Sequence, residues 1–99
     1  MLTLDEAYDY LGIEFDEHDP MIERNVQRHI QTADRHLKAA VGTDYPADDP
    51  RMKEVALMIV GELYDNRTLS AKAENRINSL ARIYMRQIRL EMGGDGDGF

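Results

Sequence analysis

The fold of this chain is decided by one stretch of its sequence, Val55-Ala56-Leu57-Met58-Ile59-Val60-Gly61-Glu62-Leu63-Tyr64-Asp65-Asn66-Arg67. Its apolar part is about nine residues long, far short of the roughly 20 that cross a bilayer, so it predicts a buried core helix and no membrane span. Apolar side chains occupy nearly all sides of this helix. We therefore expect it to be covered on more than one side, with another subunit as one source of the cover.

Start signals of two kinds predict the helices. Thr3 and Glu6 form a capping box, and Ser70 is expected to cap the last helix in a similar way. An Asp-Pro pair starts the second helix and another starts the third, because proline is pre-set for the first helical turn and needs no amide hydrogen there. These signals, with glycines as stops, predict helices over residues 4–11, 20–41, 50–66 and from 71 to 88.

The C-terminal part leaves two alternatives. Residues 86–91 continue as helix or turn into an extended strand, since Ile88 and Leu90 alternate there with charged residues. The glycine-rich segment 93–99 is expected to be a flexible tail. The fold class is therefore all-α: a small bundle of about four helices, one short and N-terminal, two long and central, and one C-terminal, forming one domain over residues 1–92.

Charge is spread unevenly along the 99 residues, whose net charge is −7. Residues 1–50 hold 12 acidic and 4 basic side chains, giving −8, whereas residues 51–99 hold 7 and 8, giving +1. A protein that binds the phosphates of a nucleic acid normally has a basic surface patch. The acidic half of this chain therefore argues against direct nucleic-acid binding. The chain has no cysteine, hence no disulfide, and its first residues lack the features of a secretory signal.

No residue pattern predicts catalysis, a cofactor or a bound metal. Three histidines, His18, His29 and His36, do not form the pattern of a metal site. His29 and His36 are seven residues apart, and neither has a carboxylate three or four residues away toward the other. Ser70 and Ser79 lie outside any nucleophile turn, and the chain has no glycine loop for phosphate. We therefore expect no enzyme activity, no cofactor and no metal ion.

Two charged segments are candidates for contacts between copies of the chain. Arg82, Arg86 and Arg89 form a basic stripe if the last helix persists, and an acidic connection over residues 14–19 includes Asp16 and Glu17. The stripe is either a solvated helix face or the partner of the acidic connection of an adjacent subunit. In the second case the contact is head-to-tail and closes into a ring when the rotation permits.

The end of the central helix carries three further candidates. We expect Tyr64 to anchor the end of the helix, Asn66 to cap it, and Arg67 to bridge to a carboxylate, favoured there by the helix dipole. The alternative is a helix terminus that serves only the monomer.

These features together resemble a known family. The opening Leu4-Asp5-Glu6-Ala7 and Tyr10-Leu11-Gly12-Ile13, with Tyr64-Asp65-Asn66-Arg67, are similar to the small helical head-tail connectors of long-tailed phages and prophages, also described as DNA packaging proteins. The resemblance implies a structural homo-oligomer that forms a ring beneath the portal protein and joins it to a tail-side adaptor or completion protein. It also implies a place in the neck of the virion, after assembly in the host cytoplasm, with DNA passing through the ring and no catalysis.

The opening also resembles an excisionase-type DNA-binding domain, in which a short helix precedes a turn and a recognition helix. Such a helix needs cationic or amide side chains near its N-terminus to meet the DNA. Acidic residues stand there instead, Glu14, Asp16, Glu17 and Asp19. A small DNA-binding regulator therefore stays as the alternative to a connector, and the mass in solution together with DNA binding separates the two.

Overall fold

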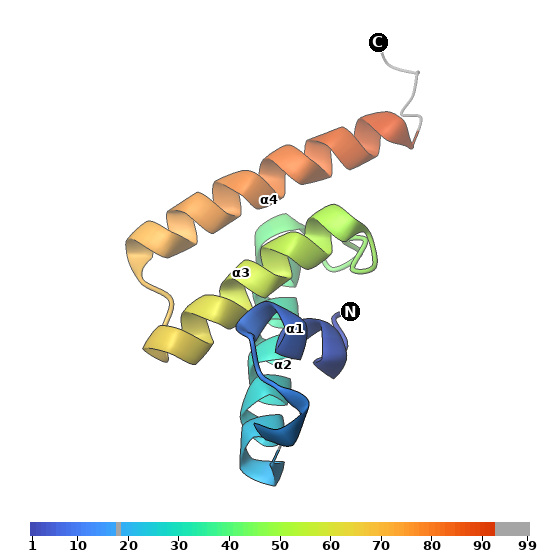
Figure 1. Cartoon of the computed structure of the whole chain (residues 1–99). Coiled ribbons are helices and arrows are strands. Elements are labelled where there is room, and N and C mark those ends of the chain that lie inside the picture. Colours follow the sequence, from blue (N-terminus) through green and yellow to red (C-terminus); the bar gives the residue numbers. More distant parts are fainter. Residues whose placement is uncertain (18, 93–99) are drawn as a thin grey trace.

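The computed structural model describes residues 1–17 and 19–92, and within them the chain is all-α (Figure 1). The predicted fold class is confirmed, and the segment 93–99, predicted to be a flexible tail, lies outside the described residues. A short 3-10 helix, η1, lies in the acidic connection and was not predicted. The elements are α1 (Leu4–Leu11), η1 (Phe15–Glu17), α2 (Pro20–Val41), α3 (Pro50–Asn66) and α4 (Ala71–Glu91).

Side-chain caps begin all four α-helices at the predicted positions. Thr3 accepts the amide hydrogen of Glu6, and the Glu6 carboxylate accepts that of Thr3, which completes the capping box. Asp19, Asp49 and Ser70 each accept an amide hydrogen from the first turn of the following helix. The predicted helix starts are therefore confirmed.

Helix α4 continues to Glu91, so the strand alternative for residues 86–91 is wrong. Met85 and Ile88 are both buried at helical spacing. Arg51, at the start of α3, binds the Glu91 carboxylate through two nitrogens, at 2.9 and 2.8 Å. The buried face and this two-point contact hold the last turns of α4 in helical form.

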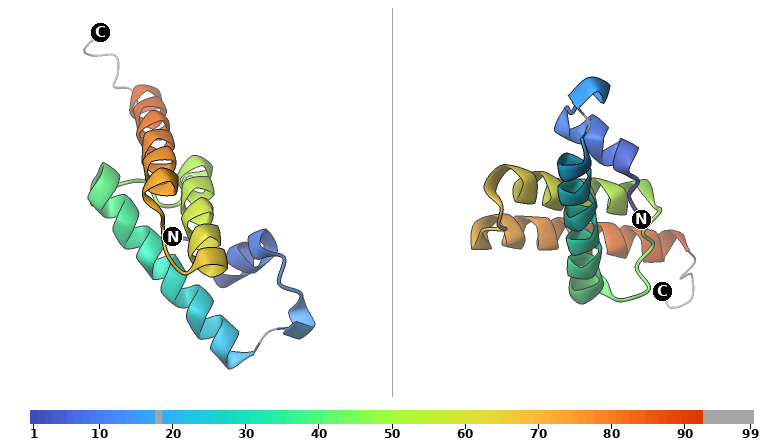
Figure 2. Two further views of the ribbon diagram at one scale, coloured as in Figure 1. Left: turned by 90° about the vertical axis from the view of Figure 1, so that its left-hand side faces the viewer. Right: turned by 90° about the horizontal axis from the view of Figure 1, so that it is seen from below.

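Helix α3 is the centre of the molecule. Helices α3 and α4 run antiparallel and side by side, and α2 crosses both steeply (Figure 2, right). The short α1 packs on α2 and α3, on the side of α3 away from α4 (Figure 1). One hydrophobic core joins the four helices; its fully buried large side chains are Val26, Leu37, Met52, Val55, Ile59, Val60 and Ile77.

The chain itself covers the apolar helix α3. Val55, Ala56, Ile59 and Val60 are all buried among the other three helices. The expectation that α3 is covered on more than one side is confirmed, but no second subunit is needed for it. Among the described residues, one exposed large apolar side chain, Tyr64, lies near the end of α3, and the others lie outside this helix. None of the helices in the described ranges is long and apolar enough to cross a membrane.

Candidate functional site

The predicted residues at the end of α3 have distinct roles. Arg67 directly follows the helix, with φ of 61°, and its amide donates to the carbonyl oxygen of Leu63 at 2.8 Å. Asn66 is the last helical residue, and its amide group contacts the Glu62 carboxylate at 3.4 Å. The prediction that Asn66 caps the helix is therefore wrong, because the left-handed residue after it, Arg67, closes the last turn. Tyr64 is 37% exposed and does not anchor the helix end in the core.

Tyr64 and Arg67 line a groove between α3 and the first half of α2. The groove has a volume of about 740 Å³. Two guanidinium groups, of Arg28 and Arg67, border it, and no carboxylate of the described residues does. The lining residues are Asn25, Arg28, His29, Thr32, Leu63, Tyr64 and Arg67. We call this the α2–α3 groove.

The cations of the α2–α3 groove have no ion-pair partner among the described residues. The ion pairs among residues 1–17 and 19–92 include neither Arg28 nor Arg67. The carboxylate that Arg67 was expected to bridge is thus not found within the described chain. Burial, and then the charge of Arg28, lower the pKa of His29, so this imidazole is neutral at pH 7. The charge of the groove therefore comes from the two guanidinium groups.

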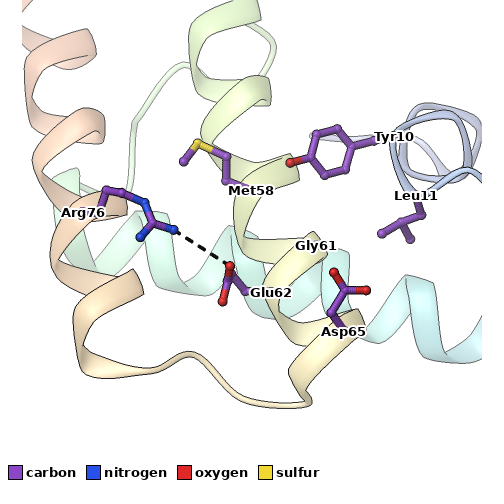
Figure 3. Close-up of a pocket in the computed structure, with 7 residues that line it drawn as sticks. All are labelled: Tyr10, Leu11, Met58, Gly61, Glu62, Asp65 and Arg76. Carbon is purple, nitrogen blue, oxygen red and sulfur yellow. Dashed lines mark ion pairs between the residues drawn. The ribbon is translucent and has the colours of Figure 1, made fainter.

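A second, smaller pocket is lined by other residues of α3 (Figure 3). It measures about 230 Å³ and is lined by residues of α1, α3 and α4. The ring of Tyr10 lies over Gly61, where a Cβ atom would stand 3.0 Å from the ring carbon Cε2. Arg76 of α4 approaches Glu62 of α3 at 3.9 Å. The contacts at this pocket pack α1 against α3. They therefore fix the position of α1, and of the connection that follows it, relative to α3.

The acidic connection follows α1 and is exposed. Asp16 and Glu17 lie in η1, and the Glu17 carboxylate accepts the amide hydrogen of Glu14 at 2.8 Å. Asp19 is occupied as the cap of α2. The side chains of Glu14 and Asp16 make no hydrogen bond or ion pair with the described part of the chain, and point their charge at solvent.

The outer face of α4 combines positive charge with apolar surface. Arg82 and Arg86 are exposed and take part in no ion pair of the described chain. Beside them Ile83 is 53% and Leu90 50% exposed. Because α4 and α1 lie on opposite sides of α3 (Figure 1), one copy does not bring this face to its own acidic connection. The predicted pairing of the stripe with the connection requires two copies.

Metal-ligating side chains do not gather in the described ranges, where no group of three or more His, Cys, Asp or Glu could hold an ion. His29 lies in the α2–α3 groove. His36 instead joins α2 to α4 through a 2.7 Å hydrogen bond to Asn78. His18 lies outside the described residues.

Sequence reasoning missed the α2 half of the groove, formed by Asn25, Arg28, His29 and Thr32. These residues occupy the polar face of α2, which the helical periodicity marks only as not core. The sequence signal that could have found them is a pair of polar residues about one helical turn apart that occurs twice, as Asn25 with Arg28 and as His29 with Thr32. What selects them from the rest of that face is the crossing of α2 over the end of α3, and this is a tertiary feature.

The described residues thus form an all-α bundle whose outer faces carry exposed charges and exposed apolar side chains. The chain belongs to the family of phage gp6-like head-tail connector proteins, which it matches over residues 1–89. It is a structural component of the phage virion that connects head and tail components. No curated protein and no solved structure matches this chain.

Proposed function

We propose that copies of this chain, through the domain of residues 1–92, assemble into a ring beneath the portal protein, join it to the tail-side adaptor or completion protein, and let DNA pass during packaging. The ring assembles in the host cytoplasm and becomes the neck of the virion. Membership of the connector family is the observation that carries the proposal. The chain takes part as a structural protein, without a catalytic step.

Opposite charge on different faces supports a head-to-tail contact between copies. The acidic connection stands on the α1 side of α3, whereas the α2–α3 groove and the outer face of α4 carry unpaired cations. A contact between two different faces repeats from copy to copy and closes when the rotation permits. The proposed contact residues are Asp16, Glu17, Tyr64, Asn66, Arg67, Arg82 and Arg86.

The net charge of −7 supports a lumen through which the genome slides. An acidic wall repels phosphate, so DNA would pass the ring without sticking to it. We expect the purified protein to retain duplex DNA no better than a neutral control protein at low salt. Clear retention would favour the alternative, a small DNA-binding regulator.

Mass measurement in solution, with and without the portal protein, tests the proposal. We expect a discrete ring, at least when the portal is present. Reversing the charge of Arg82 and Arg86 to Glu should reduce assembly if the outer face of α4 is a contact surface. Lys72→Glu is the matched control, because it reverses an exposed charge at the opposite end of the same helix. The proposed ring would be overturned if the protein stayed monomeric in the presence of the portal protein and shifted a DNA probe in a binding assay.

A further inference from the structure

The α2–α3 groove is built to receive negative charge. Arg28 and Arg67 border it without a carboxylate from the described residues, and Tyr64 adds a partly exposed aromatic ring to the lining. Guanidinium groups bind carboxylates through two parallel hydrogen bonds, and an aromatic ring contributes apolar contact at low entropic cost. The chemistry of the groove therefore fits a short acidic segment of protein.

The backbone at Arg67 supports the same conclusion. Within the described chain, Arg67 is the one residue other than glycine with a positive φ, in a region where glycine is normally preferred. Its side chain makes no hydrogen bond or ion pair there that would offset this conformation. An arginine at this position places a cation in the lining of the groove, and its left-handed backbone lowers the stability of the single copy.

The acidic connection of the same copy cannot occupy its own groove. On α3, Gly61 faces the Tyr10 ring of α1, whereas Leu63, about half a turn further round the helix, lines the groove. The connection follows Leu11, the last residue of α1, which lines the same pocket as Gly61. Groove and connection therefore open on opposite sides of α3, as a head-to-tail contact between two copies requires.

We propose that the α2–α3 groove of one copy receives the acidic connection of the next, with Arg28 and Arg67 on the carboxylates of Glu14 and Asp16 and the ring of Tyr64 against the connection. This inference rests on the proposed ring and names the contact that closes it. Of the two cationic faces proposed above for the contact between copies, the groove is then the one that receives the connection. The outer face of α4, with Ile83 and Leu90 beside its arginines, is left for the portal or the tail-side protein.

Disulfide trapping tests the contact directly, because the chain has no cysteine of its own. Glu14→Cys is placed in one preparation and Asn25→Cys, at the rim of the groove, in another; both positions are exposed, and Asp16, Arg28 and Arg67 are kept. After mixing under mild oxidation we expect a disulfide-linked dimer that contains one chain of each kind. Adding Arg28→Glu to the second chain should lower its yield at least tenfold.

The matched control replaces Asn25→Cys by Ser79→Cys, which is exposed on the outer face of α4. Cross-linking of Glu14→Cys to Ser79→Cys in preference to Asn25→Cys would overturn the groove as the receiving site. The ring, measured by mass on the wild-type chain, is read separately. A ring whose copies link only through Ser79→Cys refutes the groove contact and leaves the connector ring standing, whereas groove links without a ring support the contact and refute the ring.

Discussion

Arg67 occupies a left-handed backbone position at the end of α3. Replacing it by glycine removes the steric cost of that conformation, so Arg67→Gly should raise the free energy of unfolding by about 1 kcal/mol. The same change removes a cation from the α2–α3 groove and should weaken association between copies. Urea denaturation measures the first effect, and the mass of the assembled species measures the second.

The control for this substitution is Asn66→Gly, one residue earlier and still helical. Because Asn66 has a helical backbone, glycine relieves no strain at this position. It should lower the free energy of unfolding slightly, because glycine has a lower helix propensity than asparagine. If Arg67→Gly also lowered stability, the Arg67 side chain would be acting within the single copy, and the argument for its role between copies would lose one of its supports.

At the scale of the element, Gly61 decides how closely α1 can approach α3. Alanine in place of a glycine within a helix gains about 1 kcal/mol of propensity. Its Cβ would press on the Tyr10 ring at 3.0 Å, but Tyr10 is 52% exposed and can tilt outward. We therefore expect Gly61→Ala to stabilise the protein by a few tenths of a kcal/mol, on the order of half the propensity gain.

A double-mutant cycle with Tyr10→Ala checks this reasoning by urea denaturation. With the ring removed, Gly61→Ala should deliver the whole propensity gain, so the two substitutions should be coupled. A net loss of stability from Gly61→Ala alone would mean that the Tyr10 ring is held in place and that the α1 to α3 joint is rigid.

Elements were predictable from sequence where the signal is local. The capping box at Thr3 and the Asp-Pro pairs fix helix starts through hydrogen bonds within one turn, and the structure confirms them. The last turn of α4 was ambiguous because a strand and a helix both match its pattern. Burial of Ile88 and the contact of Arg51 with Glu91 decide it, and both depend on helices distant in sequence.

The candidate site divides in the same way. Tyr64 and Arg67 could be selected from the sequence, as residues that end an apolar run. Arg28 and His29 could not, because only the angle at which α2 crosses α3 brings them to the same groove. The conformation of Arg67 was also beyond reach, since any of the residues 65–68 could have ended the helix.

At the scale of the whole molecule, carboxylates set the response to pH. A hydrogen bond from the Thr3 backbone, followed by one from Lys53, lowers the pKa of Glu6. Burial opposes ionisation of Asp34, but hydrogen bonds from Tyr45 and Lys38 outweigh it and lower its pKa. Groups with a lowered carboxyl pKa stabilise the fold above the ordinary range near about pH 4, and this stability is lost as the pH falls through their folded-state pKa.

We therefore expect the melting temperature to fall steeply below about pH 4. His29 adds a shallower loss that begins below about pH 6.5, because its lowered pKa disfavours protonation in the folded state. Thermal unfolding between pH 2 and 7 measures both. His29→Gln should remove only the shallow part, and an unchanged profile between pH 5 and 7 would contradict the assignment to this residue.

The enclosure of α3 by its own chain separates two events in the life of this connector. Because each protomer buries the core face of its central helix without a partner, it can fold completely before it assembles. If charged surfaces make the contacts proposed above, ionic strength should shift the association of the protein with its partners while leaving the folded chain intact.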